Sequence, residues 1–151
     1  MLYATVKEGY DSLRQIYAVL HTPTYSPTPP WLRQSYSELR SIVGQGRGEC
    51  DVADVTVEHT RRLLASLPSD APKPELAVDP DGQVALDWQL APKWVLTATI
   101  AEDSMVYFAG LFGGNRYRGA EHFDQTLPKG LAASLERFIA RTVQEEAVVS
   151  N

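Results

Sequence analysis

Cysteine, clustered basic charge and long apolar runs are all scarce in this sequence. Cys50 is the only cysteine, so the chain has no internal disulfide, which is typical of proteins in the reducing cytosol. The 14 basic residues are outnumbered by 19 acidic ones and form no stripe, which argues against a nucleic-acid partner. No apolar run approaches the roughly 18 residues that cross a bilayer, and the N-terminus lacks a signal-peptide pattern. We therefore expect a cytoplasmic, mildly acidic protein that binds neither nucleic acid nor membrane.

The length of the chain, 151 residues, is ordinary for one domain. A chain of this size buries enough surface to fold without disulfides or metal. We therefore predict a single domain over residues 1–151. Within it, residues 1–50 form a helical N-terminal extension with a proline-rich connector at 22–30. Residues 51–145 are expected to form a helix, a β-meander and a final helix.

Apolar residues at helical spacing dominate the first half of the chain. They predict one helix over about 2–20, a second that starts at Pro29 and stops at Gly44, and a third that begins near Thr56. Thr56 belongs to the residue types that favour the N-cap position. Pro68 cannot continue a helix, so the third helix should end before it.

From Leu76 onward the apolar spacing changes to every second residue, which is the period of a strand. Asp81 and Gly82 predict a type I′ hairpin turn, which needs positive φ at both central positions. The run 105–112 is almost wholly apolar and predicts a central strand covered on both faces. An amphipathic helix over about 128–145 should cover the sheet. The predicted class is α+β: N-terminal helices, a four- to five-stranded antiparallel β-meander, and a C-terminal covering helix.

Four stretches of the chain form a recognisable combination. They lie between Asp51 and Ile139 and read DVADVTVEHTRRLLASLP, PELAVDPDGQVALDW, YFAGLFGG and GAEHFDQTLP. Together they resemble a family of small, uncharacterised bacterial proteins with a DPDG hairpin, a strand ending in AGLFGG and a C-terminal helix. The resemblance implies a bacterial origin and the same sheet, and it implies no activity. The loop GRGECDVAD departs from the family, because it lacks the aromatic-Asp-Gly sequence expected before the helix.

A small hydrolase is the enzymatic alternative. Cys50 or His122, with nearby carboxylates, can supply a nucleophile or a base, and His59 lies close to Cys50 in the sequence. No flanking signature of a known cysteine enzyme surrounds these residues. A loop cysteine and solvated histidines are the favoured interpretation, so the sequence assigns no catalytic residue.

Metal and phosphate sites have little support in the sequence. Glu121, His122 and Asp124 carry metal-ligating groups, but alternation along a strand sends Glu121 and His122 to opposite faces. Neither HExxH nor paired CxxC motifs accompany them. The stretches GQGRGE and GLFGGNRYRG lack the strand-loop-helix context of a nucleotide site. Arg116 and Arg118 share one strand face and can hold a carboxylate or a phosphate. We expect no cofactor and no metal.

The leading hypothesis is a non-catalytic protein-interaction module. The module is expected to be a bacterial accessory protein, or an inhibitor or antitoxin-type protein, that binds a protein partner or forms a homodimer. The proline tract and the surplus of aromatic residues favour this hypothesis, because Trp and Tyr are enriched at interface hot spots. The candidate interaction surface consists of Tyr25, Trp31, Tyr36, Arg116 and Arg118.

Overall fold

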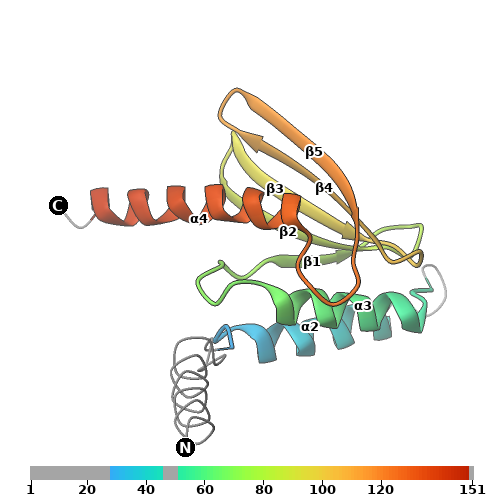
Figure 1. Cartoon of the computed structure of the whole chain (residues 1–151). Helices are drawn as coiled ribbons and strands as arrows, with labels where there is room; N and C mark the ends of the chain where they lie inside the picture. The colour runs from blue at the N-terminus through green and yellow to red at the C-terminus, as the bar shows by residue number, and fades with distance from the viewer. Residues whose placement is uncertain (1–27, 46–50, 150–151) are drawn as a thin grey trace, which may run out of the picture.

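Helices and strands follow one another in the order predicted from the apolar spacing. The computed structural model describes residues 28–45 and 51–149 (Figure 1). The helices of this part are α2 (Leu32–Gln45), α3 (Asp54–Ser66) and α4 (Lys129–Val149). The strands are β1 (Glu75–Val78), β2 (Val84–Ala91), β3 (Trp94–Ile100), β4 (Met105–Phe112) and β5 (Asn115–His122). The α+β class with an antiparallel meander and a C-terminal helix is confirmed. The helix predicted over 2–20 and most of the connector lie outside the described residues.

The strands form one antiparallel sheet in the order β1-β2-β3-β4-β5, so each strand pairs with its neighbour in sequence. The register is regular except at a bulge in β2 between Gln89 and Ala91. Gly110 interrupts the apolar run of β4 without a bulge. Its missing side chain instead makes room for the ring of Phe112, which would lie 2.6 Å from a Cβ at that position.

The described helices pack on a single face of the sheet, here called the inner face. α3 contacts β2 and β3, α4 contacts β3, β4 and β5, and α2 contacts β1 and α3. Two layers result, with α2 and α3 side by side in the helical layer (Figure 1). The first half of α4 covers the sheet as predicted. Its second half projects past the strands (Figure 1), and Val148 there is 77% exposed.

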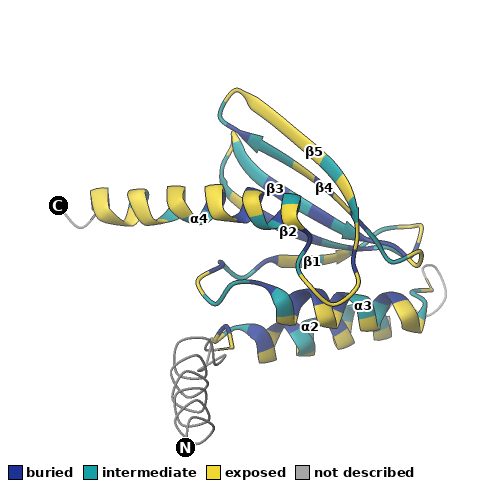
Figure 2. Ribbon diagram, viewed as in Figure 1, coloured by how far each residue is buried: buried dark blue, intermediate teal, exposed yellow. Residues whose placement is uncertain are grey.

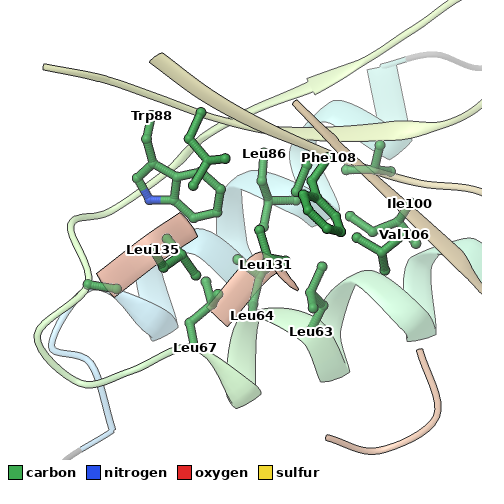
Figure 3. Close-up of a cluster of buried hydrophobic side chains, with 14 of the residues drawn as sticks. Leu63, Leu64, Leu67, Leu86, Trp88, Ile100, Val106, Phe108, Leu131 and Leu135 are labelled. Carbon is green, nitrogen blue, oxygen red and sulfur yellow. The ribbon is translucent and has the colours of Figure 1, made fainter. Parts of the chain in front are cut away.

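Alternate residues of the strands point into the space between the two layers. Figure 3 shows Leu86, Ile100 and Val106 reaching from the sheet toward Leu63 and Leu64 of α3. All five side chains are fully buried. Burial of each such side chain stabilises the fold by about 1.5–3 kcal/mol. The inner set is the one that the period-two spacing after Leu76 predicts.

The ring of Phe108 fits between two glycines. A Cβ at Gly119 of β5 would lie 2.4 Å from Cζ of Phe108, and a Cβ at Gly130 of α4 would lie 2.6 Å from the same atom. The ring also stacks against Tyr117, with centroids 6.0 Å apart. Because neither glycine carries a side chain, Phe108 can fill the corner where β4, β5 and the start of α4 meet.

The start of α3 differs from the prediction. The helix begins at Asp54, and its N-cap residue is Ala53, which makes no side-chain capping bond. Thr56 is buried inside the first turn, where its carbonyl oxygen accepts a 2.7 Å hydrogen bond from Oγ1 of Thr60. The prediction of Thr56 as N-cap was therefore wrong, because the residue faces the core. The helix ends before Pro68, as predicted.

The hairpin between β1 and β2 forms where it was predicted, with a different turn. Gly82 has a φ of +78°, whereas Asp81 has a negative φ, so the prediction of a type I′ turn was wrong. Pro80 fixes φ near −65°, which favours a turn centred on Pro80 and Asp81 and followed by a left-handed glycine. The Gly82 N–H donates to the Asp79 carbonyl oxygen at 3.0 Å and closes this turn.

Replacing Gly119 with alanine should lower the free energy of unfolding by about 1–3 kcal/mol, because the new methyl group overpacks against the buried Phe108 ring. Urea denaturation followed by circular dichroism measures the change. Gly114 is a matched control, since no atom lies within 4 Å of its Cβ position. Gly114→Ala should change the free energy of unfolding by less than about 0.5 kcal/mol. Equal losses in the two variants would contradict the role given to Phe108.

Candidate functional site

The outer face of the sheet, opposite the helices, is covered by none of the described elements. Tyr107 on this face is 43% exposed, and Ala109 is exposed as well. Figure 2 shows an exposed stretch along most of β5. The prediction that 105–112 is covered on both faces was therefore wrong for the described part of the chain. The described helices all dock on the inner face, so no described layer packs against the outer residues of β4.

Strand register places five side chains of the outer face in one row across the sheet. The paired residues, from β1 to β5, are Glu75, Asp87, Thr97, Ala109 and Arg118. Directly opposed residues of antiparallel strands lie on the same face, about 5 Å apart. The row therefore runs from two carboxylates through a hydroxyl and a methyl group to a guanidinium. We call it the charge row.

Uncharged side chains flank the charge row on its central strands. On one side Val95 pairs with Leu111, and Leu111 pairs with Arg116 at the edge of the sheet. On the other side Tyr107 pairs with Thr99. A hollow on this face is lined by Val95, Thr97, Ala109, Gly110, Leu111, Arg116, Tyr117 and Arg118. The outer face thus has an uncharged centre and charged edges.

The charged side chains of the outer face differ in their hydrogen bonds and ion pairs. Asp87 accepts a 2.6 Å hydrogen bond from Oγ1 of Thr97. Glu75, Arg116 and Arg118 are exposed, and within residues 28–45 and 51–149 none of them has an ion-pair partner. Arg116 and Arg118 share this face, as alternation predicted. Their guanidinium groups are accessible to a binding partner.

Tyr107 stands on the outer face beside the turn between β3 and β4. Its hydroxyl donates to Oδ2 of Asp103 at 3.3 Å, and the Met105 N–H donates to Oδ1 of the same carboxylate at 3.0 Å. The negative charge of Asp103 raises the pKa of Tyr107 above its ordinary value of 10.0. Desolvation and the hydrogen bond shift the pKa in the same direction. Tyr107 therefore remains a neutral hydrogen-bond donor at neutral pH.

The predicted interaction residues of the N-terminal part serve packing within the chain. Trp31 is half-buried, and its Nε1 donates to the Ala71 carbonyl oxygen at 2.9 Å. The guanidinium of Arg61 lies 5.2 Å from the ring centroid of Tyr36. These contacts join α2 to α3 and to the loop after it. Tyr25 lies outside the described residues.

The structure places His59 beside Ser104, on the face of the sheet opposite to His122. Nε2 of His59 lies 3.3 Å from Oγ of Ser104, which has a positive φ of 64° in the turn between β3 and β4. Nδ1 of His59 is buried without a hydrogen-bond partner among residues 28–45 and 51–149, so no acid in this part of the chain orients the ring as in a catalytic triad. His122 alternates onto the outer face, whereas α3 carries His59 on the inner side. Cys50 lies outside the described residues.

The carboxylate of Glu121 binds the start of α4. Its Oε1 and Oε2 atoms accept hydrogen bonds from the Gly130 N–H at 3.2 and 3.0 Å. A negative charge is favourable at a helix N-terminus, where backbone N–H groups are unpaired. His122 lies on the opposite face, as alternation predicted. Within the ranges that the structure describes, no group of three His, Cys, Asp or Glu residues can hold a metal ion.

Comparisons with known proteins assign the chain to no family. No family model, curated protein or solved structure matches the chain. The resemblance to the bacterial family with the DPDG hairpin therefore stays a prediction. Among the described helices, none is long and apolar enough to span a bilayer.

Two features of the site could not be read from single positions in the sequence. The charge row becomes visible only once the register of five strands is known, although the alternation of each strand was predicted. Ser104 lies far from His59 in the sequence and belongs to no motif. The different roles of Glu121 and His122 could be predicted in part, because strand alternation places the two side chains on opposite faces of the sheet.

Replacing Glu121 with alanine should lower the free energy of unfolding by about 1 kcal/mol, because α4 loses the acceptor at its first turn. Differential scanning calorimetry measures the change. The adjacent, exposed His122 provides the control, and His122→Ala should change the free energy of unfolding by less than about 0.5 kcal/mol. A larger loss for the histidine variant would contradict the capping role of Glu121.

Proposed function

We propose that this protein is a non-catalytic interaction module that binds a protein partner on the outer face of its sheet. Its class is that of a bacterial accessory protein of the inhibitor or antitoxin type. The observation that carries the proposal is the uncovered outer side of β4, where Tyr107 is 43% exposed and Met105 and Leu111 are only half-buried. Apolar surface of this kind, rimmed by polar residues, is typical of protein-binding sites.

The distribution of side chains on the outer face favours a protein partner. Val95, Ala109 and Leu111 occupy the centre, while Glu75 and Arg118 stand on the two outermost strands. Protein interfaces commonly combine an apolar centre depleted in charge with a polar rim. A sheet face without large central side chains also allows another layer to approach to about 10 Å.

The same face argues against a nucleic-acid partner. Arg116 and Arg118 are the basic groups at its β5 edge, and the two carboxylates of the charge row lie on the same face. A phosphate backbone would therefore meet charges of both signs instead of a continuous basic stripe. The proposal places the module in the reducing cytosol, in line with its single cysteine, and requires no cofactor.

The rival function is a small hydrolase, and the contact between His59 and Ser104 is the observation that favours it. The pair has the residue types of a nucleophile and its base. Against it stand the Nδ1 of His59, which has no hydrogen-bond partner in the described part of the chain, and the location of Ser104 in a tight turn. Labelling by a fluorophosphonate probe that disappears in Ser104→Ala would favour the hydrolase over the interaction module.

Replacing Ala109 with arginine should abolish partner binding while leaving the fold intact. Ala109 is exposed at the centre of the outer face, so a long charged side chain blocks the approach of another protein without entering the core. Affinity capture from native lysate with the full, tagged chain measures binding. Thermal unfolding should show a similar melting temperature for the variant and the wild type.

The control for this experiment is the same substitution on the helical layer. Ala65 is exposed on α3, and Ala65→Arg should retain the partner that the wild type captures. Capture that survives Ala109→Arg and is lost in Ala65→Arg would assign binding to the helices. Failure of the wild type to bind any protein, itself included, would remove the proposal.

A further inference from the structure

We propose that the partner on the outer face is a second copy of this chain, and that the two sheets pack face to face about a two-fold axis parallel to β3. This inference rests on the proposed function and names the occupant of the same face. It follows from the charge row, which runs from acidic to basic across a face that no described element covers.

A two-fold axis parallel to the strands reverses the order of the strands across the interface. β3 then faces β3 of the second copy, β2 faces β4, and β1 faces β5. Glu75 of each copy consequently meets Arg118 of the other, and Thr97 meets its own symmetry mate. An isologous interface requires a surface that is complementary to itself, and the charge row meets this requirement.

The second way of stacking the two faces is excluded by the same charges. A two-fold axis in the plane of the interface but perpendicular to the strands sets β1 over β1 and β5 over β5. Arg118 would then face Arg118 and Glu75 would face Glu75. Like charges in direct apposition are costly at an interface. The charge row therefore selects the orientation with the axis along the strands.

The centre of the charge row allows the close approach that this packing needs. Stacked sheets lie about 10 Å apart. Thr97 and Ala109 have short side chains, and the Thr97 hydroxyl keeps its hydrogen bond to Asp87 when water leaves. Aligned sheets cross at about 30°, and the long side chain of Arg118 spans the resulting offset from Glu75 at the outermost strands.

The area of the face is sufficient for a reversible dimer. Five strands about 4.8 Å apart, each about seven residues long, present roughly 500 Å². Two such faces bury about 1,000 Å² in total, which is near the lower limit of specific interfaces. Opposed charges at the edges contribute orientation and association rate. We therefore expect a dimer that weakens as added salt screens these charges.

A charge exchange between Glu75 and Arg118 tests the inference. Sedimentation equilibrium of the full chain at low salt should show a dimer. Arg118→Glu and Glu75→Arg should each weaken self-association at least tenfold, because each substitution creates like-charge contacts at both symmetry-related positions. An equimolar mixture of the two variants should recover the dimer, since every Glu then faces an Arg in the mixed pair.

Arg33→Glu is the matched control for net charge. Arg33 is exposed on α2, in the helical layer, and this variant should dimerise like the wild type. Circular dichroism should be the same for all variants, because every substituted side chain is exposed. A dimer that both reversals leave unchanged, or a mixture that remains monomeric, overturns the inference.

A monomeric wild type also overturns the inference, and the capture experiment then decides the proposed function. If the wild type captures another protein and Ala109→Arg does not, the proposed function is supported, with a different protein as the partner. A monomeric wild type that captures no protein contradicts both the dimer and the proposed function. A photoreactive residue at position 107 can also be tested for crosslinks to residues 1–27 of the same chain. Such crosslinks would contradict both the dimer and the proposed function, because the chain would then cover its own outer face.

Discussion

The ring of Phe108 lies between Gly119 of β5 and Gly130 of α4, and the position of the last strand depends on this contact. No residue of β5 is fully buried, so the strand is held by its hydrogen bonds to β4, by the bond of Glu121 to Gly130 of α4, and by the ring against its inner side. Arg116 and Arg118 project from the other side of the same strand. The basic edge of the outer face is therefore positioned by a buried aromatic ring that no partner can touch.

Strand alternation places neighbouring residues on opposite faces of the sheet, where one contributes to the core and the next is available for binding. Phe108 fills the core, while Ala109, the next residue, lies at the centre of the outer face. Glu121 binds the first turn of α4, while His122 lies on the side opposite the helices. Glu121 and His122, which suggest a metal site in the sequence, thus lie on opposite faces of the sheet.

Apolar spacing was sufficient to predict the order and type of the described elements, because each helix or strand buries one face and this requirement repeats locally. The turn at Gly82 was misjudged because Pro80 shifts the centre of the turn by one residue. Thr56 was misjudged because burial against the sheet outweighs its preference for an N-cap. The open side of β4 could not be predicted, since it depends on where the helices dock, and the charge row required the register of all five strands.

The confinement of the described helices to one face has a further consequence for the proposed dimer. Packing of the two outer faces would place the two helical layers on opposite sides of the assembly. Any contact made by a helical layer would then exist twice, on opposite sides of the assembly. Such a particle would be bivalent, and a target with two matching sites at the right spacing would be bound by avidity, far more tightly than one layer alone allows.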